Sequence, residues 1–286
     1  MEFSPRMKRN MLTAHAAAVG SMVLLKNINQ TLPLRPAGSE PLPVAVFGTG
    51  QVRTVLACPD FSLYRGVSIL DGLTASPLVK PDPLLAHKYR AWALSHPTGE
   101  YPWRGLSMEE LAEENAAAIV VLSRDEDAYD PIVNNDELAM IEAVTRAFPR
   151  TVLILNTPGY MEVYQAAALC SAVVYMGIPG QEGGAALSEL LTGEAVFLGH
   201  LNQSWPRRRA DFIQANQVLD IYAGYRYFDT FGTELLYDFG YGLTYGAAEL
   251  AAVAVAVDGK DLVVSAQVVN TGDTWPVSQV GQGYVS

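Results

Sequence analysis

The chain has 286 residues, half of them apolar, which is enough for a globular fold with one full core and a smaller second unit. Its formal net charge is −11, so it has no basic stripe to neutralise phosphates, and nucleic acid and membrane surfaces are excluded as main partners. No apolar run reaches the length of a membrane span, and residues 1–19 lack the apolar core of a signal peptide. We therefore expect a cytoplasmic protein, and neutral ligands such as sugars remain open.

Helical and strand patterns alternate through residue 193. A helix is expected over residues 6–19. Residues 21–26 and 31–34 form an apolar entry to the domain, and the first clear strand is Val44–Phe47. Further strands are predicted at 118–122, 151–155 and 172–176, with helices after Ser107 and over residues 135–148, 162–169 and 184–191. Such alternation predicts an α/β sandwich over residues 1–193, a mostly parallel sheet with helices on both faces.

The pattern changes after Gly193. Residues 194–246 are rich in aromatic side chains and read as a connecting segment that packs on the sandwich. From residue 247 onward, alternating valines on either side of an Asp258-Gly259 turn predict a β-hairpin, and a third strand is expected near Val277. Residues 247–286 are fewer than the roughly 100 that a complete β-sandwich needs, so this unit is predicted to be a partial antiparallel β-sandwich.

No metal or cofactor site is indicated by the cysteines and histidines. Cys58 and Cys170 lack metal-ligand spacing and are expected to be buried thiols. The four histidines are scattered, without a pattern for metal binding or activation of a nucleophile. We therefore expect no cofactor.

Three strings carry a specific resemblance: Ile178-Pro-Gly-Gln-Glu-Gly-Gly184, Asp220-Ile-Tyr-Ala-Gly-Tyr-Arg-Tyr-Phe-Asp229 and Asp238-Phe-Gly-Tyr-Gly-Leu-Thr-Tyr245. In this order and spacing they resemble the second, α/β domain of glycoside hydrolase family 3, the β-glucosidase and β-xylosidase group. The resemblance implies a fibronectin type III-like domain beginning near residue 247. It also implies a catalytic (β/α)8 barrel as partner, in the same chain or a companion chain.

The family's nucleophile stands in a Ser-Asp-Trp or Ser-Asp-Phe context on that barrel, and neither string occurs here. The sequence is therefore expected to be a fragment without the barrel, which matches the front piece of those relatives that place the α/β domain first.

The loop Ser123-Arg-Asp-Glu-Asp-Ala-Tyr-Asp130 is the strongest candidate for chemistry. It crowds four carboxylates after a predicted strand, and crowding raises the proton affinity of a carboxylate, as a general acid requires. A solvated acidic loop is the simpler reading of the same residues. The family carries Arg-x-Ser/Ala-Gly-Glu here, and Arg124 and Glu126 match its ends, although the step between them is shorter. The resemblance makes Glu126 the candidate acid/base, with Arg124 and Asp127 as candidate substrate contacts.

Two glycine-containing segments have structural explanations. Gly48-Thr-Gly-Gln51 lacks the third glycine of a dinucleotide fingerprint and is predicted to be a tight turn after a strand. Gln181-Glu182 lies between glycines at an expected helix start, where a carboxylate favours the helix dipole.

The sequence thus predicts a family 3 type domain that hydrolyses β-glycosidic bonds in small oligosaccharides or glycosides when joined to a barrel, and is inactive alone. The alternative is a degenerate domain that binds carbohydrate or a partner without chemistry, which the lost glycine step beside Glu126 favours. A nucleotide-binding enzyme is poorly supported.

Overall fold

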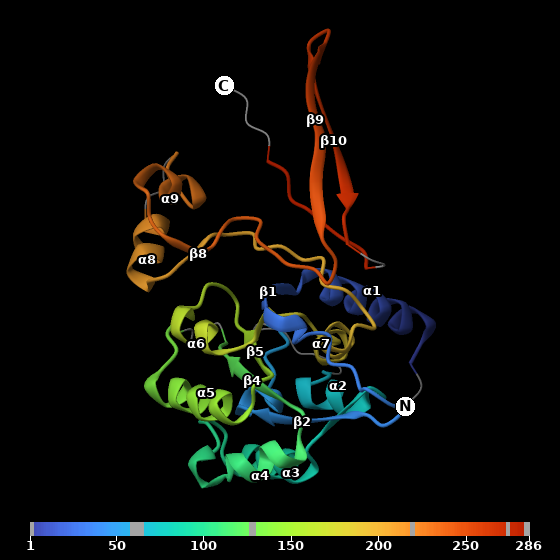
Figure 1. Ribbon diagram of the computed structural model, residues 1–286, viewed down its shortest axis with the longest axis vertical. Helices are drawn as coiled ribbons and strands as arrows, with labels where there is room; N and C mark the ends of the chain where they lie inside the picture. The colour runs from blue at the N-terminus through green and yellow to red at the C-terminus, as the bar shows by residue number, and fades with distance from the viewer. Residues whose placement is uncertain (1–2, 58–65, 126–129, 218–220, 273–274, 283–286) are drawn as a thin grey trace.

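The computed structural model describes residues 3–57, 66–125, 130–217, 221–272 and 275–282, and its centre is a mostly parallel sheet (Figure 1). In these ranges the sheet has six strands in the order β1-β6-β5-β4-β2-β3. The strands are β1 Val23–Asn27, β2 Leu42–Phe47, β3 Val79–Pro81, β4 Ala117–Ser123, β5 Thr151–Asn156 and β6 Ala172–Tyr175. The predicted fold class and the four predicted strands are confirmed.

One strand of this sheet runs against the others. β1 pairs antiparallel with β6, from Val23 opposite Tyr175 to Asn27 opposite Ala172. The sequence pattern indicated only an apolar entry here, because a short apolar run does not reveal a pairing partner that lies far along the chain. The sheet is therefore mixed, with an antiparallel strand at one edge.

Helices cover both faces of the sheet, as predicted. Along β4, Ala118, Val120 and Leu122 belong to one buried cluster, whereas Ala117, Ile119 and Val121 belong to the other. This alternation is that of a strand buried on both sides. The first face is covered by α3 Pro83–Ser95, α4 Met108–Glu114, α5 Asn135–Ala147 and α6 Tyr164–Leu169, and the second by α1 Pro5–Ser21, α2 Ile69–Ala75 and α7 Gly183–Thr192. Short 3₁₀ helices are η1 Ile28–Gln30, η2 Thr49–Gln51 and η3 Trp103–Gly105.

The aromatic-rich segment packs on the sandwich through a buried tryptophan. Trp205 lies edge-on to Tyr160 and Tyr175, with ring centroids 5.7 and 5.3 Å apart. It belongs to β7 Trp205–Pro206, which pairs with β8 Leu235–Tyr237, while α8 Arg209–Gln217 and α9 Tyr225–Phe231 lie farther out (Figure 1). Packing, not sugar stacking, accounts for Trp205.

The predicted hairpin is confirmed and projects away from the sandwich (Figure 1). It consists of β9 Ala248–Asp258 and β10 Asp261–Asn270. The third strand expected near Val277 does not form within the described residues 275–282, which are irregular. The expectation for Cys170 is correct: its thiol is buried, and burial raises its pKa to about 12. Cys58 lies outside the described residues. None of the described helices combines the length and hydropathy needed to cross a bilayer.

Candidate functional site

The loops after β2, β4, β5 and β6 meet at one edge of the sheet, because these parallel strands all end there. β2 and β4 are neighbours in the sheet, although β3 separates them in sequence and lies on the other side of β2. The chain therefore leaves β2 toward β3 on one side and leaves β4 toward β5 on the other. In open α/β sheets this topological switch point is where ligands bind.

Asn156, the last residue of β5, ties these loops together. Its Oδ1 accepts hydrogen bonds from the Val55 amide at 2.7 Å and from Ser123 Oγ at 3.1 Å. Its Nδ2 donates to the carbonyl oxygens of Val55 and Gly177, at 2.9 and 2.8 Å. The side chain is fully buried, so these bonds replace solvent and hold the loops in fixed positions.

The turn after β2 is the tight turn that the sequence predicted. Gly48 has φ of 92°, and a Cβ atom there would lie 2.1 Å from the Val121 carbonyl oxygen. Only glycine combines this backbone conformation with such close approach. The turn therefore lies directly against β4, beside the residues that lead into the acidic loop.

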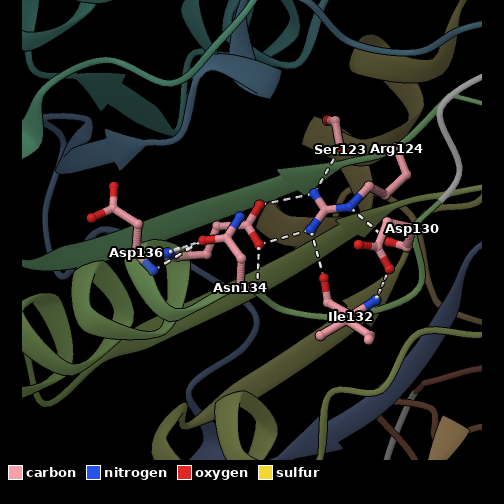
Figure 2. A network of polar contacts seen from close by, with 7 residues as sticks. Ser123, Arg124, Asp130, Ile132, Asn134 and Asp136 are labelled. Carbon is pink, nitrogen blue, oxygen red and sulfur yellow. Dashed lines mark hydrogen bonds and ion pairs between the residues drawn. The ribbon is translucent and has the colours of Figure 1, made fainter.

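Arg124 follows β4 and is held by acceptors of the chain itself (Figure 2). Nε donates to the Asp130 carbonyl oxygen at 2.9 Å, Nη1 to that of Ser123 at 2.9 Å, and Nη2 to that of Ile132 at 3.0 Å. Nη1 and Nη2 also donate to the Glu137 carboxylate, at 2.8 and 2.7 Å. These contacts occupy all five N–H groups of the guanidinium.

Glu137 joins this arrangement to the start of α5. Besides the arginine, its carboxylate accepts from the Asn134 amide at 3.0 Å, while Asn134 Oδ1 accepts from the amides of Asp136 and Glu137, both at 2.9 Å. This is a capping box, which satisfies amides that a helix start leaves without partners. We call Arg124, Asn134 and Glu137 together the loop clamp. It fixes both flanks of the acidic loop to a rigid helix.

The loop clamp is largely removed from solvent, since the Arg124 and Glu137 side chains are each 13% exposed. Bidentate arginine–carboxylate pairs in such surroundings are strong and geometrically specific. A sugar could contact Arg124 only by displacing one of the present acceptors, so the substrate contact predicted for Arg124 stays a prediction. Glu126 and Asp127 lie outside the described residues, and their predicted roles are untested.

Glu137 was missed at the sequence level, although a signal for it exists. Asn134-Asn-Asp-Glu137 has the spacing of a capping box, and so does Ser107-x-x-Glu110, where a helix was expected to begin. At Ser107 the structure shows the side-chain cap, with Ser107 Oγ accepting from the Glu110 amide at 3.3 Å. The sequence did not reveal that the Glu137 carboxylate also receives Arg124.

Curated proteins similar to this chain are glycosidases. "Probable beta-glucosidase L" of Aspergillus fumigatus is 30% identical, with 96% of this chain and 40% of that protein covered. The exo-alpha-(1->6)-L-arabinopyranosidase of Bifidobacterium longum is 28% identical, with 91% and 37% covered. The chain thus spans about 40% of the length of the curated relatives it matches.

A solved structure has the same fold and similar coverage. Beta-glucosidase 3B from Thermotoga neapolitana, in complex with alpha-D-glucose, superposes with a TM-score of 0.85 at 29% identity, covering 94% of this chain and 43% of that one. The family model of the glycosyl hydrolase family 3 C-terminal domain matches residues 22–245. The match includes all six strands of the central sheet and nearly all of the aromatic-rich segment, so this chain belongs to glycoside hydrolase family 3 and carries the family's C-terminal domain.

Proposed function

We propose that this chain supplies the acid/base half of a retaining glycosidase, which hydrolyses β-glycosidic bonds when the domain is joined to a (β/α)8 barrel. Family membership and the glycosidase relatives support this proposal, as does the chain's span of about 40% of their length. In this proposal Glu126 is the acid/base and the partner barrel supplies the nucleophile. The substrate is a β-linked saccharide or glycoside.

The observation that carries the proposal is the loop clamp. Arg124 holds the carbonyl oxygens of Asp130 and Ile132 on one flank of the acidic loop and that of Ser123 on the other. A general acid must sit within hydrogen-bond reach of the glycosidic oxygen, so its loop needs supports of this kind. The clamp lies at the carboxyl edge of the sheet, where α/β proteins bind ligands.

Without a barrel, the chain should not hydrolyse glycosides. A retaining glycosidase uses two carboxyl groups roughly 5–5.5 Å apart, and the nucleophile forms a covalent glycosyl-enzyme that water then hydrolyses. The sequence contains neither Ser-Asp-Trp nor Ser-Asp-Phe, the contexts in which the family carries its nucleophile. We expect aryl β-glucosides and β-xylosides to remain intact with this chain.

The test joins this chain to the barrel of a family relative, by fusion or in trans. Hydrolysis of an aryl β-glucoside should appear, and Glu126→Gln should reduce it strongly, with partial rescue by azide when the leaving group is good. Glu109→Gln is the control, because it makes the same change at an exposed carboxylate on α4, outside the acidic loop, and should retain most activity. Hydrolysis by the isolated chain, lost in Glu126→Gln, would contradict the proposal.

A carbohydrate-binding domain without chemistry is the second candidate. The observation that favours it is the short step between Arg124 and Glu126, which lacks the glycine of the family motif. A fusion that binds sugar but shows no hydrolysis would select this candidate. For residues 247–286 we propose the beginning of a fibronectin type III-like unit, with residues 194–246 as connector.

A further inference from the structure

We propose that a cavity beside the outer edge of β3 binds a small organic molecule that carries a phosphate group, with Lys80, His87 and Arg90 as the donors. We call it the edge cavity; its walls also include Ser76 and Val79. None of the lining residues belongs to the acidic loop, the loop clamp or the loops after β2, β4, β5 and β6. The inference therefore goes beyond the glycosidase proposal, and each can fail while the other stands.

The edge cavity lies where the central sheet ends. β3 is the outermost strand beyond β2, so among the described residues no strand pairs with its outer side. Helix α2 covers one face of the sheet here and α3 covers the other, and an ion pair between Asp71 of α2 and Arg90 of α3 joins them at 2.7 Å. The cavity has a volume of about 500 Å³, within the range of small-molecule sites.

Hydrogen-bond donors from β3 and α3 meet in this cavity. Lys80 lies between the buried residues Val79 and Pro81, and because side chains alternate along a strand, Lys80 is on the face that α3 covers. His87 and Arg90 are three positions apart on α3 and so share one side of the helix. The lining residues that the structure describes include no aspartate or glutamate. The local charge is therefore opposite to the net charge of the chain.

These donors retain capacity for a ligand. Lys80 and His87 form no hydrogen bond or ion pair with any other described residue. Arg90 uses one N–H group, from Nη2 to Asp71 Oδ1 at 2.7 Å. A lysine ammonium has three N–H groups, a guanidinium has five, and a histidine ring has at least one. Most of the donors around the cavity are therefore available to an anion.

A phosphate group matches this set of donors. An ammonium binds phosphate as a point charge and a guanidinium binds it through its planar fork. Ser76 Oγ accepts from the Leu78 amide at 3.2 Å, so its own O–H can still donate. A phosphate ester offers three strong acceptor oxygens, enough to contact the lysine, the arginine and the serine together. Neutral and cationic ligands would leave the positive groups without partners.

Acidic side chains close to the cavity are already engaged by the protein. Asp71 accepts from Arg90 through Oδ1 and from Ser68 Oγ through Oδ2, both at 2.7 Å. Asp82 is buried and caps α3, with Oδ1 accepting from the Leu85 amide at 2.7 Å. Neither carboxylate lines the cavity, so neither replaces an anionic ligand there.

The rest of the wall favours a small organic molecule over a peptide. Lysine and proline at a sheet edge hinder pairing with a further strand, and Pro81 has no N–H to offer such a strand. Edge protection accounts for Lys80 and Pro81, but it does not require donors of α3 to face the same cavity. Pro81, Pro83 and Ala86 form an apolar part of the wall, which can cover the uncharged part of a ligand.

The experiment is a titration of the full chain with phenyl phosphate at constant ionic strength, followed by amide chemical shifts. Inorganic phosphate, benzoate and benzyl alcohol are separate probes. We expect saturable shifts at Ser76, Val79 and His87 with both phosphates and none with benzyl alcohol. Lys80→Gln removes the ammonium and should weaken binding of phenyl phosphate about tenfold. The matched control is Lys88→Gln, because Lys88 is on α3 but does not line the cavity, and it should leave the affinity unchanged.

Charge reversal separates a specific site from a general effect of net charge. Lys80→Glu and Lys88→Glu change the net charge equally, but only Lys80→Glu should abolish the saturable shifts. Lys80 is exposed, so its variants should remain folded, which the amide spectrum of the rest of the chain checks. Absence of saturable shifts, equal losses in the Lys80 and Lys88 variants, saturation by benzyl alcohol at the same residues, or tighter binding of benzoate than of phenyl phosphate would overturn the proposal.

Discussion

Arg124 and Glu137 lie 13 positions apart in the chain, yet their side chains form a two-pronged ion pair with N–O distances of 2.8 and 2.7 Å. The pair links the end of β4 to the start of α5, with the acidic loop between them. The same guanidinium also donates to three backbone carbonyl oxygens that flank the loop. The clamp therefore stabilises the start of α5 and also fixes the position of the loop.

We predict that Glu137→Gln lowers the free energy of unfolding by about 3 kcal/mol, because removal of one partner leaves a buried charge without compensation. Urea unfolding measures the change. The control is Asp136→Asn, in the same helical turn, since Asp136 pairs with Arg104 at the surface, with side chains 54% and 61% exposed. Such pairs contribute at most about 1 kcal/mol. Equal losses in the two variants would show that the loop clamp adds no stability of its own.

Stability should depend on the protonation of Glu100. Its pKa in the folded state is raised above 4.5, chiefly by burial, so the folded state holds this proton more tightly than the unfolded state does. By linkage, its contribution is most favourable below the unfolded-state pKa and is lost as the pH rises through the folded-state pKa.

Glu100→Gln resembles the protonated form and is not subject to this loss. Relative to the unchanged chain, the variant should therefore gain stability as the pH rises from about 4 to about 7. Urea unfolding across this pH range tests the trend. Glu109→Gln is the control, because its free energy of unfolding should differ from that of the unchanged chain by the same amount at every pH. A difference that moves in the opposite direction would mean that the hydrogen bonds from Thr49 outweigh burial.

Helices α2 and α7 pack too closely at Gly72 to leave room for a methyl group there. A Cβ atom there would lie 2.0 Å from the Gly184 carbonyl oxygen, and a backbone atom cannot turn aside as a side chain can. We predict that Gly72→Ala destabilises the chain by about 1–3 kcal/mol, as overpacking does. Gly20→Ala in α1 is the control, because no atom lies within 4 Å of its Cβ position and alanine favours helix. Thermal unfolding should separate the two variants, and a neutral Gly72→Ala would show that the helices move apart freely.

Amide hydrogen exchange should be fast in the β9–β10 hairpin and slow in β4. The hairpin is a separate two-stranded sheet with exposed apolar side chains, among them Val255 at 62% and Val257 at 77% exposure. Two strands without a packed face are marginally stable in water, whereas β4 is buried on both sides. Mass spectrometry after exchange distinguishes the segments, and similar protection in both would indicate that another surface covers the hairpin in solution.

Much of the fold was predictable because it follows from local patterns. The strands β2, β4, β5 and β6 were predicted from short apolar runs separated by helical periodicity, and the hairpin was predicted from alternating valines around Asp258-Gly259. Side-chain periodicity is set by the backbone of each element, so it can be read without knowing what the element contacts. The family resemblance was also local, because it was carried by three short strings between residues 178 and 245.

The position of β1 and the hydrogen-bond partners at the carboxyl edge of the sheet were decided only by the tertiary structure. β1 pairs with β6, Asn156 bonds Val55 from 101 positions away, and Glu100 accepts from Thr49 across 51 positions. Such partners are chosen by the order of strands in the sheet, which brings loop ends together in space. A single residue's chemistry shows only that it can donate or accept a hydrogen bond. Its partner is fixed when the packing of the sheet removes both from water, because a buried polar group must then be satisfied by what lies beside it.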